Sequence, residues 1–134
     1  MAEALPGGCL CGAVRYAVTG PYANPSLCHC SMCRKAAGAP YIAFLTVPRA
    51  RFRLTAGPYR LYRSSDKAQR GFCPNCGTTL TWESTRRQDA LDVSIATLDD
   101  PAAVPPVDQI WCDEAISWTD TTPALPRHAR ERNG

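Results

Sequence analysis

Seven of the eight cysteines in this chain fall in three short clusters, and no other feature constrains the fold as strongly. The clusters are Cys9-x-Cys11, Cys28-x-Cys30-x-x-Cys33 and Cys73-x-x-Cys76, and Cys112 stands alone. Thiolates this close together repel one another unless a metal ion or a disulfide holds them. The chain is therefore expected to build its fold around metal sites or around disulfides.

Metal ligation is favoured over disulfides. The segment from Met1 to Gly7 has no cationic start followed by an apolar stretch, so it does not resemble a secretion signal. Cysteines in a reducing compartment usually stay as thiols, and clustered thiols there are more often metal ligands. We expect a cytoplasmic protein with reduced cysteines.

Length and charge limit the partners. The 134 residues fit one domain, expected over 1–134 with a core at about 7–126 and a flexible tail at 127–134. A net charge of +3 is too small to indicate a nucleic acid partner, and the basic tail from Arg127 to Arg132 is interrupted by Glu131. No apolar run approaches the roughly 20 residues needed to cross a membrane. Small-molecule partners are expected, and the oligomeric state is left open.

The hydrophobic pattern predicts a mainly β fold of about eight short strands with little helix. Strands are expected at Val14–Val18, Tyr41–Val47, Phe52–Leu54, Tyr59–Arg63, Thr78–Glu83 and Leu91–Ile95. Within them, Leu80 and Trp82 should share one face. One short helix is expected from Ser31 to Ala37, before Gly38 and Pro40. The proline-rich stretch from 101 to 106 should be extended, residues 121–134 should form a loose tail, and Cys112 should be a small core residue.

The spacing of Cys73 and Cys76 predicts half of a tetrahedral zinc site. Pro74 favours a tight turn between the two thiolates, and Gly77 allows the positive φ that brings backbone N–H groups to the sulfurs. Two further ligands are needed, and Cys9 and Cys11 can supply them from one side of an extended strand. These four cysteines are predicted to form a closed, structural site.

The middle cluster predicts a different kind of site. Cys28, Cys30 and Cys33 can occupy three corners of a zinc tetrahedron, while His29 should point away between its neighbours. Three protein ligands with a vacant fourth position are typical of catalytic zinc. Strong sulfur donation favours exchange of a thiol ligand over generation of hydroxide. Arg34 and Lys35 follow directly and either offset the negative charge, bind a substrate carboxylate, or lie on the helix surface.

Several of these segments resemble the glutathione-dependent formaldehyde-activating family, whose domain is shared with centromere protein V. The resemblance runs from about Gly7 to Pro126 and rests on Gly7–Tyr16, Cys28–Lys35, Gly38–Pro40, Phe72–Thr78, Thr97–Asp99 and Ile110–Trp118. It implies a β-tent fold of small antiparallel sheets built around zinc. It also implies a structural zinc on Cys9, Cys11, Cys73 and Cys76, and an exchangeable zinc on Cys28, Cys30 and Cys33. The family often has histidine where this chain has Gln109, which cannot titrate near neutral pH.

Two functions remain open from the sequence. The first is a carbon–sulfur lyase, similar to an S-hydroxymethylglutathione synthase, that joins glutathione or a related thiol to an aldehyde. The second is a non-catalytic binding module in which both zinc ions are structural. The incomplete ligand set of the middle cluster favours the enzyme.

Overall fold

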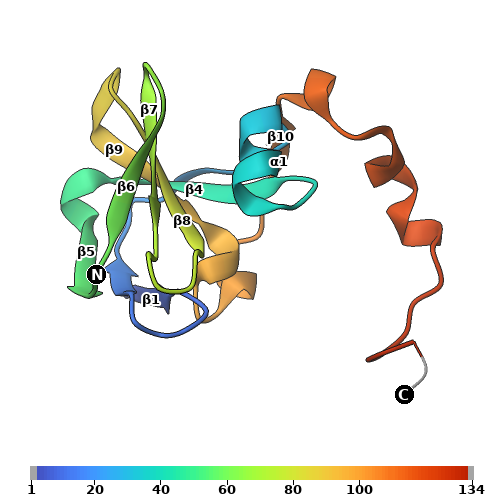
Figure 1. Cartoon of the computed structure of the whole chain (residues 1–134), viewed down its shortest axis with the longest axis horizontal. Helices are drawn as coiled ribbons and strands as arrows, with labels where there is room; N and C mark the ends of the chain where they lie inside the picture. The colour runs from blue at the N-terminus through green and yellow to red at the C-terminus, as the bar shows by residue number, and fades with distance from the viewer. Residues whose placement is uncertain (1–2, 133–134) are drawn as a thin grey trace.

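The computed structural model describes residues 3–132, and its architecture consists of two β-sheets with short helical segments (Figure 1). The strands are β1 Leu5–Gly8, β2 Arg15–Val18, β3 Ala23–Cys28, β4 Ile42–Pro48, β5 Phe52–Ala56, β6 Arg60–Ser65, β7 Ala68–Phe72, β8 Thr79–Ser84, β9 Arg87–Ser94 and β10 Asp108–Ile110. The α-helix is α1 Ser31–Ala37, and the 3₁₀ turns are η1 Arg49–Arg51, η2 Ile95–Thr97, η3 Pro101–Ala103, η4 Cys112–Glu114 and η5 Ser117–Ala124. The predicted mainly β fold class is confirmed.

The two sheets differ in size. The smaller sheet has the order β1-β2-β5 and is antiparallel throughout. The larger sheet has the order β10-β3-β4-β9-β8-β7-β6. All of its neighbours are antiparallel except β10 and β3, which run parallel. The expectation of small antiparallel sheets therefore holds for most strand pairs, while the larger sheet also contains this parallel pair.

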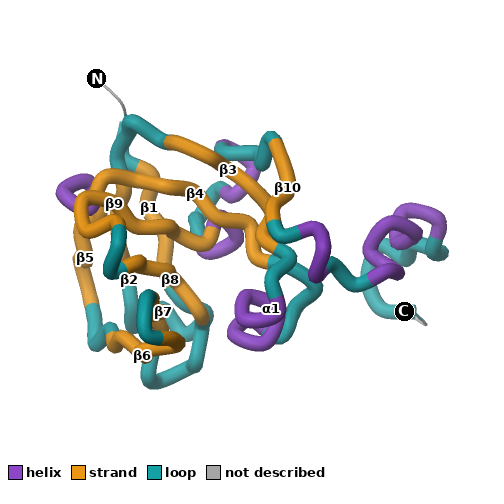
Figure 2. The backbone as a smooth tube through the Cα atoms, turned by 90° about the horizontal axis from the view of Figure 1, so that it is seen from above, coloured by secondary structure: helices purple, strands orange, loops and turns teal. Residues whose placement is uncertain are grey.

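The alternation of side chains along β4 gives the larger sheet two apolar faces. Leu45 and Val47 belong to the main core, which also contains the buried residues of β2 in the smaller sheet. Ile42 and Phe44 point to the opposite face, where they pack with Cys28 and Cys33. Because successive residues of a strand face opposite sides, one strand contributes to both clusters. Figure 2 shows α1 on the side of the molecule away from β1, β2 and β5.

The expectation that Leu80 and Trp82 share a face is wrong. Leu80 is fully buried in the main core, whereas Trp82 packs on the opposite face of the sheet, against the cluster that contains Cys28 and Cys33. The pairing of β7 with β8 shifts register between Gly71 and Phe72, so Leu80 is an extra residue on β8. After such an extra residue, each side chain lies on the sheet face opposite to the one that simple alternation predicts.

The helix prediction is confirmed over the predicted range. Cys30 caps the N-terminus of α1, with its Sγ accepting a hydrogen bond from the Cys33 amide at 3.3 Å. Gly38 ends the helix in the left-handed region, at φ 63°. The structure also contains four strands that the hydrophobic pattern did not predict, namely β1, β3, β7 and β10.

The C-terminal part differs from expectation in three ways. The stretch from 101 to 106 begins with the turn η3 rather than extended chain, and η5 overlaps the predicted tail. Cys112 is exposed and is not a core residue. The segment after β10 leads away from the body of the molecule (Figure 1). The last two residues of the predicted 127–134 tail lie outside the described residues. Within residues 3–132, no helix has the length and apolar character required to cross a bilayer.

Side-chain hydrogen bonds connect the segment Thr97–Asp99, at the end of η2, to the smaller sheet. The hydroxyl groups of Tyr16 and Thr97 are 2.7 Å apart, and the Arg15 guanidinium donates to the Asp99 carboxylate. Gly7 lies directly beneath this contact. A Cβ at Gly7 would be 2.5 Å from Tyr16 Cζ and 2.7 Å from the Thr97 carbonyl oxygen.

Replacement of this glycine should therefore destabilise the fold. We expect Gly7→Ala to lower the free energy of unfolding by about 1–3 kcal/mol, because the new methyl group overpacks a buried contact. Denaturant titration followed by circular dichroism measures the change. Leu10→Ala, at a side chain that is 87% exposed in the same segment, is the control and should change stability by less than about 0.5 kcal/mol. Equal stability of Gly7→Ala and the wild type would contradict the packing described here.

Candidate metal centres

Two turns from distant parts of the chain bring four cysteine sulfurs together. Cys9, Cys11, Cys73 and Cys76 all have their Sγ atoms within 4.8 Å of one another. Cys9 and Cys73 are buried, while Cys11 lies at the surface. The first turn follows β1 and the second follows β7, so the cluster joins the smaller sheet to the larger one.

Each turn is closed by a glycine with a positive φ, which follows the first cysteine by three residues in one turn and by four in the other. In the second turn, Gly77 has φ 82°, and its amide donates to the Cys73 carbonyl oxygen at 2.8 Å. In the first turn, Gly12 has φ 82°, and its amide donates to the Cys9 carbonyl oxygen at 3.2 Å. The prediction of an extended strand at Cys9 and Cys11 is wrong, because β1 ends at Gly8 and both cysteines lie in this turn.

Hydrogen bonds to sulfur hold the four cysteines in place. The Val14 amide donates to Cys9 Sγ at 3.2 Å, and the Cys76 amide donates to Cys73 Sγ at 3.4 Å. Asn75 Nδ2 donates to Cys11 Sγ at 3.2 Å and so connects the two turns. Such donors stabilise thiolates, the form in which cysteine binds metal.

Thr78 supports the same cluster from two directions. Its hydroxyl oxygen accepts a hydrogen bond from the Leu10 amide at 3.1 Å and lies 3.2 Å from Cys76 Sγ. The hydrogen bond from this hydroxyl, followed by that from the Thr78 amide, lowers the pKa of Cys76 to about 5. One threonine therefore joins the two turns and favours the thiolate of a candidate ligand.

The spacing of the four sulfurs fits a tetrahedral zinc ion. At a Zn–S distance of about 2.3 Å, the sulfurs of a regular tetrahedron lie about 3.8 Å apart. Cys9 and Cys11 have their sulfurs 3.6 Å apart, and Cys11 and Cys73 have theirs 3.8 Å apart. This donor set can hold a metal with all four positions filled by protein.

The second group contains three sulfurs on the other face of the larger sheet. Cys28 is the last residue of β3, Cys30 caps α1, and Cys33 lies in its first turn. Their Sγ atoms lie within 4.8 Å of one another, and no histidine or carboxylate of residues 3–132 joins them at that distance. Cys28 and Cys33 are buried, whereas Cys30 is partly exposed. An open fourth position would face the side of Cys30.

A hydrogen bond joins two of the three sulfurs. Cys33 Sγ donates to Cys28 Sγ at 3.3 Å. This hydrogen bond lowers the pKa of Cys28, and together with burial it raises the pKa of Cys33. A metal that binds all three sulfurs must displace the proton from Cys33.

His29 is separated from the sulfur cluster by its hydrogen bonding. Its Nε2 lies 2.8 Å from Oε1 of Gln109, and its ring meets Tyr41 edge-on with the ring centroids 5.2 Å apart. Gln109 belongs to β10, which pairs with β3 beside Cys28. Gln109 therefore contacts His29 and makes no described contact with a cysteine sulfur.

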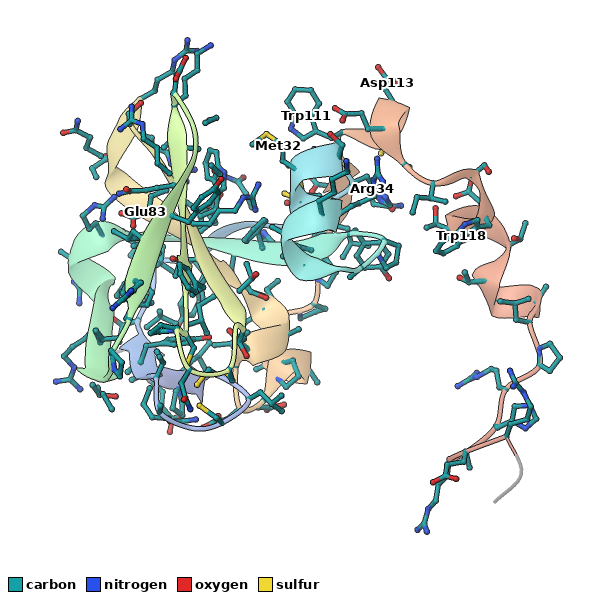
Figure 3. The ribbon with its side chains drawn as sticks, viewed as in Figure 1. Met32, Arg34, Glu83, Trp111, Asp113 and Trp118 are labelled. Atoms are coloured by element: carbon teal, nitrogen blue, oxygen red, sulfur yellow. The ribbon has the colours of Figure 1, made fainter. Side chains whose placement is uncertain are left out.

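The two basic residues after Cys33 have different surroundings. Arg34 is half-buried on α1 and projects toward the C-terminal segment (Figure 3). There the Ser31 amide, and to a smaller extent Arg34, lowers the pKa of Glu114, whose Oε1 accepts that amide at 3.0 Å. Lys35 is exposed on the helix surface.

Two residues near the three cysteines were missed by the sequence analysis. Arg70 on β7 donates from Nη2 to Cys33 Sγ at 3.5 Å, and Trp82 on β8 packs against the same cluster. Arg70 lies three residues before Cys73. Residues an odd number apart on a strand face opposite sides, so prediction of β7 would have placed Arg70 on the face away from Cys73.

The role assigned to the threonine in the four-cysteine cluster can be tested by substitution. We expect Thr78→Val to weaken metal binding at that site by roughly tenfold, because it removes a hydrogen bond to a ligand and the acceptor that joins the turns. Thr78→Ser keeps the hydroxyl and should bind like the wild type. Competition with a metallochromic chelator measures the affinity. Equal affinities for the valine variant and the wild type would show that the hydroxyl does not support the site.

Comparison with known proteins finds similar sequences. The chain matches the family model described as glutathione-dependent formaldehyde-activating enzyme over residues 4–114. It is 35% identical to an uncharacterized lyase of Schizosaccharomyces pombe over 59% of this chain and 57% of the relative. It is 29% identical to a protein of Halomonas elongata named as a putative glutathione-dependent formaldehyde-activating enzyme, over 76% of this chain and 70% of that protein. The chain thus spans little more than half the length of the fission yeast relative.

A solved structure has a similar fold. The crystal structure of a Rhodobacter sphaeroides protein superimposes with a TM-score of 0.62 at 28% identity, covering 78% of this chain and 99% of that one. The family model covers most of the chain and includes all seven clustered cysteines. The chain therefore belongs to the glutathione-dependent formaldehyde-activating enzyme family.

Proposed function

We propose that this protein is a zinc-dependent carbon–sulfur lyase that joins glutathione, or a related thiol, to an aldehyde, as an S-hydroxymethylglutathione synthase does. The observation that carries this proposal is the three-sulfur group of Cys28, Cys30 and Cys33, which has no fourth protein ligand within residues 3–132. A purely structural zinc site normally has four. The names of the fission yeast and Halomonas relatives support the same class of reaction.

The proposal assigns two zinc ions to the chain. Cys9, Cys11, Cys73 and Cys76 hold the structural ion, and Cys28, Cys30 and Cys33 hold the exchangeable one. Zinc is chosen because clusters of four or three thiolates suit it, and because its tetrahedral geometry matches the sulfur spacing. None of the eight cysteines, all of which lie within residues 3–132, forms a disulfide, which fits a reducing compartment such as the cytoplasm.

The reaction needs no oxidant or reductant. The thiol loses its proton to solvent, its sulfur forms a bond to the carbonyl carbon, and the carbonyl oxygen takes up a proton to become a hydroxyl group. A zinc ion held by Cys28, Cys30 and Cys33 would supply an exchangeable position for the thiol and would lower the thiol pKa. The protein's own contribution is to hold the two reactants together in a partly dry site.

The residues around the three cysteines have separate proposed roles. Arg34 and Lys35 bind a carboxylate of the thiol cosubstrate as it enters beside Cys30. Phe44 and Trp82 keep water from the inner side of the site, where Cys33 is only 3% exposed. Gln109 stays neutral at all working pH values and holds His29 by its 2.8 Å contact.

Because one site is proposed to be structural and the other exchangeable, a cysteine-to-serine substitution should have a different effect at each site. Cys30→Ser should give a folded protein that lacks one zinc ion, because the three-cysteine group lies outside the main core. Cys73→Ser should fail to fold, because Cys73 is a buried member of the four-sulfur cluster that joins the sheets. Circular dichroism and metal analysis per chain measure both results. A folded Cys73→Ser protein with one zinc ion would contradict the structural role.

The reaction itself is tested by exchange NMR. Formaldehyde and glutathione form an adduct reversibly, and we expect the protein to accelerate exchange between free glutathione and the adduct. Cys30→Ser should lose this acceleration while keeping its fold. If the wild type with two zinc ions leaves the exchange rate unchanged, the lyase proposal is wrong for this aldehyde and thiol. Two zinc ions that also resist exchange in millimolar glutathione would instead support a binding module.

A further inference from the structure

Arg70 carries a buried positive charge at the three-cysteine site. Its side chain leaves β7, the residue is only 6% exposed, and Nη2 lies 3.5 Å from Cys33 Sγ. Its Nη1 is buried and has no hydrogen-bond partner within residues 3–132. Buried polar groups nearly always have a partner, so an unpaired N–H beside a ligand site requires an explanation.

The strand places this arginine on the face of the second site. A Cβ added to its neighbour Gly71 would meet Tyr59 and Thr81, which lie on the side of the main core. Arg70 therefore faces the other way, and it pairs across the sheet with Trp82, which packs against the three cysteines. The guanidinium thus belongs to the wall of this site.

Arg70 is not part of an ordinary ion pair. The ion pairs among residues 3–132 join other residues, namely Arg15 with Asp99, Arg49 with Glu83, and Arg87 with Asp92. A buried charge without a counter-charge is costly, and arginine cannot avoid the cost by losing its proton. Within the described part of the chain, the Arg70 guanidinium hydrogen-bonds to the Cys33 sulfur and forms no ion pair with a carboxylate.

The net charge of the site determines how Arg70 would affect the binding of a fourth ligand. Three thiolates around a divalent metal ion leave a single negative charge, which the guanidinium neutralises. A fourth thiolate then brings the group back to a single negative charge, whereas without Arg70 the same ligand would produce a double one. In a site of low dielectric, this difference strongly affects which ligands can bind.

We propose that Arg70 makes the three-cysteine site selective for an anionic fourth ligand, a thiolate in particular, and that Nη1 is the donor reserved for that ligand. The inference rests on the proposed function, since it names the residue that lets the open position accept a thiol as thiolate. It assigns to β7 a role distinct from the carboxylate binding proposed for Arg34 and Lys35.

Cobalt(II) replaces zinc in the experiment, because its visible spectrum reports a new ligand directly without turnover. The cobalt protein is titrated with glutathione and, separately, with imidazole, which binds as a neutral ligand. We expect Arg70→Gln to weaken glutathione binding by roughly tenfold to a hundredfold and to leave imidazole binding nearly unchanged. Arg70→Lys keeps the charge and should recover most of the glutathione affinity.

Two further variants complete the test. Arg70→Met removes the charge but fills the same buried space with an unbranched apolar chain, so it serves if the glutamine variant does not fold. Lys67→Gln removes an exposed positive charge from the turn before β7 and should bind both ligands like the wild type. If loss of the Arg70 charge changes glutathione and imidazole binding equally, or changes neither, the inference is wrong while the proposed function stands. If wild-type cobalt protein does not respond to glutathione, both are wrong.

Discussion

The contact of four cysteine sulfurs between the turn after β1 and the turn after β7 is the constraint on which the rest of the structure depends. The two turns are more than sixty residues apart in sequence and belong to different sheets. Short strands alone give a modest core, whereas a structural zinc ion can contribute roughly 10 kcal/mol, comparable to the net stability of a whole domain. Asn75 and Thr78 connect the same two turns through hydrogen bonds. These hydrogen bonds and a bound metal would therefore stabilise the same contact between the two sheets.

The larger sheet separates this closed cluster from the open one. Leu45 and Val47 of β4 pack in the core that contains Cys9 and Cys73, while Phe44 packs with Cys28 and Cys33 on the opposite face. A metal in the first cluster would be surrounded by protein ligands and would serve the fold. A metal in the second would have a free position next to the partly exposed Cys30. The alternation of strand residues thus places a group of four sulfurs and a group of three on opposite faces of one sheet.

The cysteine spacing predicted both groups of sulfurs because ligation requires particular local turns, which Gly77 and the helix cap at Cys30 encode directly. The fold class and α1 were predictable for similar local reasons. The strand β10 was not, because its pairing with β3 joins residues about eighty positions apart. Leu80 and Trp82 were misplaced by an extra residue that only the register with β7 reveals. Arg70 was missed because its contact with Cys33 joins residues 37 positions apart in sequence, which no local pattern encodes.

Anomalous diffraction at the zinc edge from crystals of metal-loaded protein tests the central claim most directly. We predict two peaks per chain, one surrounded by the sulfurs of Cys9, Cys11, Cys73 and Cys76, and one bound by those of Cys28, Cys30 and Cys33. The second should have a non-protein fourth ligand. A single peak, or a disulfide among the last three cysteines in reduced, zinc-saturated protein, would contradict the account.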